Sequence, residues 1–277
     1  MQRTERGGRP LTFQPPPALA LLPRVGSNAL MLSTDKAWQK WGRDDPYFGV
    51  LADPRFAAGR IDQTREAFFA SGQAWVAGLI AQHEHHFGPL PRGRALDHGC
   101  GVGRLALPLA AAFDAVVALD VAPAMLAEAS RNAAAAGAAN IAFALADDTL
   151  SRAAGRFDFV NSHLVLQHIP VRRGLVILGA LLDRVAPGGS FHVQFTLRTD
   201  SGPWRWLYWA SANVPGVKLV QNVLAGRPPT APAMQMNDYP LGPIVAGLTA
   251  RGITSLAVTT ASEPRFTSVS LIGRVPG

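Results

Sequence analysis

The chain has 277 residues, of which 48% are hydrophobic and 16% charged, and this composition is that of a globular protein rather than a disordered one. The formal net charge is +7, but the arginines are scattered and form no run longer than Arg172-Arg173. Proteins that bind nucleic acid usually cluster their basic residues, so we predict no nucleic-acid partner. Cys100 is the only cysteine, which excludes an intramolecular disulfide and a cysteine-built zinc site and fits a reducing, cytoplasmic location. The apolar runs are too short for a membrane span, so we expect no membrane partner.

The first residues of the sequence carry no helix or strand signal. Residues 1–33 are rich in Pro, Arg and Gly and predict a disordered tail without an export signal. Translation starting at Met31, where "MLSTDKAWQKWG" begins, is an alternative that a peptide from residues 1–30 of the native protein would exclude. A helical extension over residues 34–92 follows, in which residues 64–86 show an apolar stripe at helical spacing.

Strand and helix signals alternate after the extension, as in "RALDHG", "AVVALDV", "NIAFALAD", "RFDFVNSHLV" and "SFHVQFTL" with helical stretches between them. This alternation predicts an α/β core over residues 93–197, with a doubly wound, mostly parallel sheet. Residues 198–236 interrupt the rhythm and are expected to form an inserted cap. Residues 237–277 predict a helix and an antiparallel strand pair that complete a seven-stranded sheet.

The stretch "LDHGCGVG" places three glycines between a predicted strand and a predicted helix. Glycines at such a turn let a ligand approach bare backbone N–H groups at a helix N-terminus. One candidate ligand is a dinucleotide, because Gly101 to Ala106 satisfies G-x-G-x-x-A and Asp120 closes the second strand seventeen positions after Gly103. This interpretation corresponds to an NAD-dependent oxidoreductase.

Asp97 favours a different ligand. An acidic residue at the end of the strand suits a ligand that carries cationic groups and opposes an anionic pyrophosphate. S-adenosylmethionine carries both an ammonium and a sulfonium. The stretch resembles the first motif of the class I S-adenosylmethionine-dependent methyltransferases, in which an acidic residue precedes G-x-G-x-G.

The resemblance continues in order through "ALDVAPAML", "LADD", "FDFVNSHLVLQHIP" and "LDRVAPGGSFHV", and covers about residues 90–196. It implies a Rossmann-like fold and S-adenosylmethionine as cofactor. It also implies that Asp120 contacts the ribose hydroxyls, that Val121 and Met125 lie near the adenine, and that Asp147 accepts from its amino group. The residues that it places at the cofactor are Asp97, Gly99, Cys100, Gly101, Gly103, Asp120, Val121, Met125, Asp147, Asp148, Asn161 and Ser162.

Other polar residues permit weaker assignments. Of Asp147 and Asp148, one is expected to bind adenine and the other to cap the next turn. No catalytic base is assigned: the candidates are His163, His168 and Tyr239, of which His168 is expected rather to be structural. The histidines near the end of the 64–86 helix are expected to be solvated, and no metal site is predicted. They are His83, His85 and His86.

The function expected from the resemblance is methyl transfer to an O, N or C nucleophile of a small molecule by in-line displacement. A non-catalytic S-adenosylmethionine-binding protein is an alternative, beside the oxidoreductase. The aromatic group from Trp204 to Trp209 predicts either a lid over the acceptor or core and dimer contacts, so a homodimer stays open.

Overall fold

The computed structural model describes residues 34–199, 210, 214, 216–224, 231–232, 234–263 and 265–277. The predictions for residues 1–33 and for the aromatic group from Trp204 to Trp209 lie outside these described residues.

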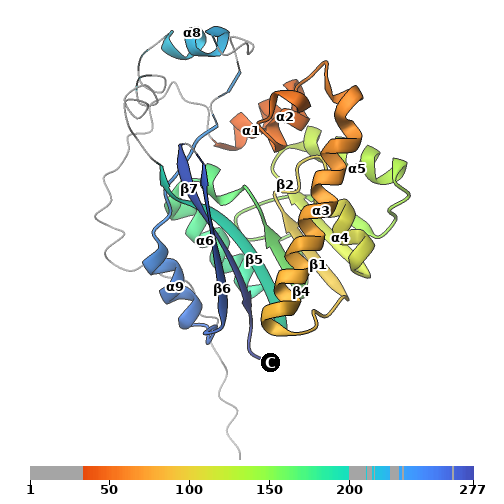
Figure 1. The fold of residues 1–277 in the computed structure, drawn as a ribbon, viewed down its shortest axis with the longest axis vertical. Helices are drawn as coiled ribbons and strands as arrows, with labels where there is room; N and C mark the ends of the chain where they lie inside the picture. Colours follow the sequence, from red (N-terminus) through yellow and green to blue (C-terminus); the bar gives the residue numbers. More distant parts are fainter. Residues whose placement is uncertain are drawn as a thin grey trace, which may run out of the picture.

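The described residues form one seven-stranded sheet with the order β3-β2-β1-β4-β5-β7-β6 (Figure 1). The strands are β1 Arg94–His98, β2 Ala115–Asp120, β3 Ile141–Leu145, β4 Phe157–Ser162, β5 Val185–Thr199, β6 Leu256–Glu263 and β7 Phe266–Arg274. The first five strands are parallel, and β7 pairs antiparallel with both β5 and β6. The predicted fold class, with its antiparallel last strand, is therefore confirmed.

Helices cover both faces of this sheet (Figure 1). The helices of the described residues are α1 Thr34–Asp44, α2 Pro46–Val50, α3 Ile61–Phe87, α4 Ala106–Ala112, α5 Pro123–Ala135, α6 Val171–Asp183, α8 Val217–Leu224 and α9 Leu241–Thr249, with short 3-10 turns η2 Pro54–Phe56 and η3 Leu166–His168. Helices α3 and α4 bury apolar residues against one face, whereas α6 and α9 bury theirs against the other. The division of the chain into extension, core, cap and C-terminal unit remains a prediction.

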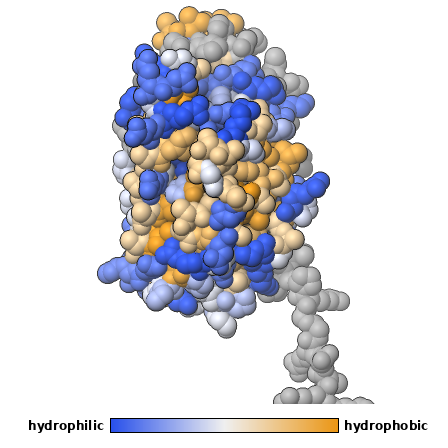
Figure 2. All heavy atoms as spheres, turned by 90° about the vertical axis from the view of Figure 1, so that its right-hand side faces the viewer, coloured by the Kyte–Doolittle hydropathy of each residue, from blue (hydrophilic) through white to orange (hydrophobic). Residues whose placement is uncertain are grey.

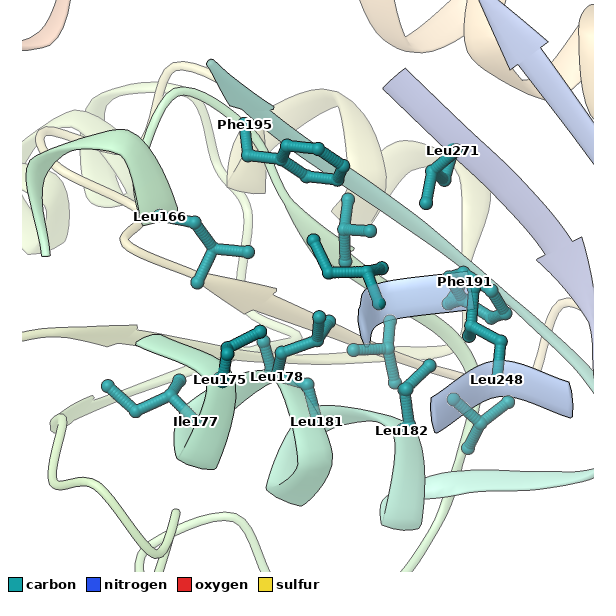
Figure 3. Packing of buried hydrophobic residues seen from close by; sticks show 14 of the residues in the cluster. Leu166, Leu175, Ile177, Leu178, Leu181, Leu182, Phe191, Phe195, Leu248 and Leu271 are labelled. Atoms are coloured by element: carbon teal, nitrogen blue, oxygen red, sulfur yellow. The ribbon is translucent and has the colours of Figure 1, made fainter. Parts of the chain in front are cut away.

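The α6 face of the sheet holds the larger hydrophobic cluster (Figure 3). Leu175, Leu178 and Leu182 recur at helical spacing along α6 and are buried there. They meet Phe191 and Phe195 of β5, which point to this face because side chains alternate along a strand. The intervening β5 positions are polar and face α3, so the sequence of β5 itself separates an apolar face from a polar one.

His83 corrects one prediction, because it is completely buried rather than solvated. It lies on the face of α3 that also buries Val76 and Leu79, and its Nε2 hydrogen-bonds Ser190 Oγ of β5. Burial lowers its pKa to about 4, so the ring is neutral at physiological pH. His85 and His86 are exposed, as expected.

Helix α8 exposes apolar side chains to solvent. It lies at the top of the molecule in Figure 1, where Figure 2 shows a group of apolar atoms. They belong to Leu219, Val220, Val223 and Leu224. Among the helices of the described ranges, none combines the length and the apolar character needed to cross a membrane.

Candidate cofactor-binding site

A cavity of about 460 Å³ opens at the carboxyl ends of the parallel strands. Its position between β1 and β4 is where the strand order reverses, which is the usual ligand site of such sheets. Most residues predicted at the cofactor lie on its wall: Asp97, Gly99, Cys100, Gly101, Asp120, Val121, Met125, Asp147 and Asp148. Gly103, Asn161 and Ser162 do not.

The glycine loop needs its glycines for two reasons. Gly99, Gly101 and Gly103 all have positive φ, at +76°, +53° and +89°. In addition, a Cβ on Gly99 would lie 2.2 Å from a methyl of Val165, and one on Gly101 would lie 2.4 Å from a methyl of Val50. The loop therefore keeps its bare backbone turned toward the cavity.

Asp120 ties this loop to the end of β2. Its Oδ2 accepts the Gly101 N–H and its Oδ1 accepts the Ala122 N–H, both at 2.9 Å. Burial raises the pKa of Asp120 to about 6, against the lowering effect of these backbone bonds. An ionised carboxylate has about four acceptor positions, so both oxygens still have room for ligand hydroxyls.

Asp97 has one satisfied and one unsatisfied oxygen. Its Oδ1 accepts from Asn161 Nδ2 at 2.8 Å, while Asn161 Oδ1 accepts from His192 Nδ1 at 2.9 Å. The buried Oδ2 has no hydrogen-bond partner in the described part of the chain. Burial raises the pKa of Asp97 to about 6, and a cationic ligand would relieve that cost.

Arg104, at the end of the glycine loop, was not singled out by the sequence. Its side chain lines the cavity although it is only 5% exposed, and its Nε has no partner among the described residues. Burial lowers its pKa to about 10, so it is still a cation near neutral pH. Asp97 and Arg104 thus offer opposite charges beside the loop, which fits the ammonium and carboxylate of an amino acid.

The two carboxylates behind β3 are already engaged. Asp147 Oδ1 accepts from the backbone N–H and the hydroxyl of Thr149, so Asp147 caps the turn that follows. Asp148 Oδ1 accepts a hydrogen bond from Arg173 Nε at 2.9 Å. The two terminal nitrogens of the same guanidinium donate to the two carboxylate oxygens of Asp35 in α1, at 2.6 and 2.9 Å. This three-residue ion-pair cluster holds α1 over the cavity.

Residues 95–189 match the family model described as a methyltransferase domain. This segment of the chain is a methyltransferase domain. The match agrees with the motif series, which indicates a methyltransferase rather than an NAD-dependent oxidoreductase.

Solved structures agree with the methyltransferase fold. One is magnesium protoporphyrin IX methyltransferase from Synechocystis PCC 6803 with bound SAH, with a TM-score of 0.58 and 20% identity over 88% of this chain and 100% of that one. Another is the N-methyltransferase NodS from Bradyrhizobium japonicum WM9, with a TM-score of 0.53 and 14% identity over 89% and 100%. The S-adenosylmethionine-dependent methyltransferase SibL gives a TM-score of 0.50 and 25% identity over 84% and 62%.

The methyltransferase cavity also contains three histidines in different settings. His98 Nδ1 lies 3.1 Å from Ser162 Oγ, and His168 Nδ1 donates to the Gln235 carbonyl at 2.6 Å. His168 also packs on Trp38 of α1, in keeping with its expected structural role. His163 makes no hydrogen bond to any residue that the structure describes and instead stacks on Trp75, with ring centroids 4.0 Å apart.

Two further predictions need correction in the methyltransferase structure. Tyr239 does not reach the acceptor side: it is 1% exposed, packs on Phe195, and donates its hydroxyl to the Ile169 carbonyl. Asn161 and Ser162 lie behind the cavity wall, where they hydrogen-bond Asp97 and His98. Their position at the end of β4 is as expected, but Asp97 and His98 line the cavity and they do not.

Proposed function

We propose that this protein transfers a methyl group from S-adenosylmethionine to a small-molecule nucleophile. The observation that carries the proposal is the unpartnered Oδ2 of Asp97, which lies beside the glycine loop and near the charge of Arg104. This pair suits the amino-acid end of the cofactor, whereas a pyrophosphate would meet the Asp97 carboxylate unfavourably. The likeness to SibL, named as a methyltransferase, supports the same activity.

The remaining cofactor contacts follow from the cavity wall. We assign Asp120 to the ribose hydroxyls and Val121 and Met125 to the adenine. Asp147 and Asp148 lie at the adenine side, with their carboxylates held by the following turn and by Arg173. Asn161 and Ser162 act as supports of Asp97 and His98 rather than as direct ligands.

When bound, the cofactor supplies an activated methyl group on a sulfonium, which is a good leaving group. The chain itself has to position the nucleophile in line and to exclude water. Apolar side chains of the N-terminal helices cover the cavity beside the glycine loop: Trp38 of α1, Val50 of α2 and the adjacent Leu51. The ion pairs of Arg173 with Asp35 and Asp148 connect this apolar cover to the loop after β3.

The proposal is tested by calorimetry with S-adenosylhomocysteine and with NAD. We expect binding of S-adenosylhomocysteine and none of NAD, and the reverse result would overturn the proposal. Transfer of labelled methyl from S-adenosylmethionine to a panel of acceptors then separates the enzyme from a protein that binds the cofactor without catalysis.

Asp120→Ala is expected to weaken S-adenosylhomocysteine binding by about 1.5–3 kcal/mol for each charge-assisted hydrogen bond lost. Part of the effect comes from the loop, since the Gly101 and Ala122 N–H groups lose their acceptor. Calorimetry measures the loss, and thermal unfolding shows whether the variant is folded. Unchanged affinity would refute the ribose assignment.

A cytoplasmic location, the cap function of residues 198–236 and a homodimer remain predictions from the sequence.

A further inference from the structure

The cavity continues beyond the cofactor-binding half. Past β4 its wall is formed by Leu164, Met236 and Phe266, together with Gln167, and Met234 adjoins it from the apolar cluster of α1 and α2. The strand order places β4 between the glycine loop on β1 and the start of β7 at Phe266. This second half, which we call the acceptor half, is largely apolar.

The charged side chains of the cavity wall already have counterparts or belong to the cofactor half. Asp35 and Asp148 share Arg173, and Asp147 caps its turn. Asp97 and Arg104 flank the glycine loop, and so does Asp120. Within the described residues, the acceptor half therefore offers no carboxylate to seat an ammonium and no cation to seat a carboxylate.

His163 lies where the two halves meet, directly after β4. Its ring packs on Trp75 of α3 at 4.0 Å and lies 5.8 Å from His192 of β5, and those two rings are 5.0 Å apart, measured between ring centroids. Nδ1 is enclosed and has no hydrogen-bond partner among the described residues. Nε2 is not among the enclosed, unpartnered atoms, so we take it as the nitrogen that faces the cavity. Burial, with His192 and Arg104 nearby, lowers the pKa of His163 well below its usual value, so the imidazole is neutral.

A neutral imidazole in an apolar wall matches one kind of nucleophile best. An uncharged hydroxyl can donate its hydrogen to the imidazole lone pair and leave its apolar skeleton against the methionines. A cationic amine would have to lose water without gaining an opposite charge, and an anionic carboxylate would find a cation only in Arg104, where it competes with the carboxylate of the cofactor.

We propose that the acceptor is an uncharged hydroxyl compound on an apolar skeleton, a phenol or an alcohol, and that His163 Nε2 receives its hydroxyl proton. This inference rests on the proposed methyltransferase function. In the step, the oxygen forms a bond to the methyl carbon and the carbon–sulfur bond breaks with its electron pair on sulfur. The hydroxyl proton passes to Nε2, so the products are an ether, a neutral thioether and an imidazolium that returns its proton to water.

The first test measures binding to protein saturated with S-adenosylhomocysteine. The probes are 2-naphthol, 2-naphthoate and 2-(aminomethyl)naphthalene, which share one apolar ring system and differ in charge, with phenol as a smaller hydroxyl compound. We expect at least one of the two hydroxyl compounds to bind about tenfold or more tightly than the anion and the cation. If neither hydroxyl compound binds, or if a charged probe binds best, the proposal is overturned.

The second test assigns the effect to His163. His163→Leu is expected to weaken binding of the hydroxyl probe about tenfold, whereas His163→Gln, which keeps an acceptor atom, retains most of the affinity. The ¹⁵N resonance of His163 Nε2, assigned by its absence from His163→Gln, should shift when the hydroxyl probe binds. No shift, or equal affinity in wild type and His163→Leu, would refute the role of His163.

Affinity for S-adenosylhomocysteine is measured first in every variant. If the wild-type protein does not bind S-adenosylhomocysteine, the proposed function itself is refuted. If it binds S-adenosylhomocysteine but shows no preference for the hydroxyl probes, only this inference is refuted. Retained cofactor binding in His163→Leu also shows that the variant is folded.

Discussion

Asp97→Asn is expected to weaken binding of S-adenosylhomocysteine by about 2–3 kcal/mol, roughly a hundredfold, because it removes the charge opposite the ligand ammonium. The introduced asparagine can still accept the hydrogen bond from Asn161 Nδ2 through its Oδ1. The lost binding energy therefore comes from replacing Oδ2, which in the wild type has no partner among the described residues. Calorimetry measures the change. Asp114→Asn, an exposed carboxylate at the opposite end of the sheet, is the matched control and should leave affinity unchanged.

The same carboxyl predicts how binding depends on pH. Because the pKa of Asp97 is about 6 in the free protein, the carboxylate that binds the ammonium is lost as the pH falls through 6, and affinity falls with it. Asp120 has a similarly raised pKa and adds to this decline, so Asp97→Asn should flatten the pH profile in part. A wild-type affinity that stays constant from pH 7 to about 5 would contradict the assignment.

The free energy of unfolding of the ligand-free protein should change with pH in the direction opposite to the cofactor affinity. Since burial raises the pKa of Asp97 above its ordinary value of 3.8, the folded state takes up a proton before the unfolded chain does. This contribution to the free energy of unfolding is therefore present at low pH and is lost as the pH rises through about 6. Bound S-adenosylhomocysteine should remove the trend by keeping Asp97 ionised.

Gly72→Ala is expected to lower the free energy of unfolding by about 2–3 kcal/mol through overpacking. A Cβ at position 72 of α3 would lie 2.2 Å from the backbone carbonyl oxygen of Arg104, and backbone cannot rotate aside as a side chain can. Helix α3 would have to move off the end of the glycine loop, so cofactor affinity should fall as well. Denaturant unfolding and calorimetry measure the two effects.

Gly78→Ala, on the same helix, is the control. Position 78 is exposed, and a Cβ there meets nothing within 4 Å. Its substitution should raise the free energy of unfolding by about 0.5–1 kcal/mol, because alanine is the better helix former. Equal effects at the two glycines would show that α3 does not depend on close approach to the loop.

The sequence predicted what local pattern and motif order can encode. Alternating strand and helix signals predicted the α/β sheet, and the terminal pair predicted its antiparallel edge, both of which the structure confirms. The series from Asp97 to the start of β5 indicated the methyltransferase domain that residues 95–189 match, and most of its motifs lie at the carboxyl end of a strand. The repeat of apolar side chains and the positions of glycines are local properties of the chain, so they can be interpreted without knowing which distant segments pack against them.

The tertiary structure decided which side chains the motifs meet. His192 supports Asp97 through Asn161 only because β1, β4 and β5 are adjacent in the sheet, and nothing near His192 in sequence indicates this. Its alternation along β5 signals a common face with Ser190, but not the partner. In the same way, burial of Arg104 and of His163 depends on α3, which precedes both in the chain.

The sequence by itself therefore determined the fold and the methyltransferase domain of this protein, because these follow from local periodicity and from the order of short motifs. Only the tertiary structure decided that Asp97 keeps one oxygen unpartnered among the described residues, that Tyr239 belongs to the core, and that His163 faces an apolar acceptor half. Those outcomes depend on contacts between segments far apart in the chain, which strand register and helix packing establish together.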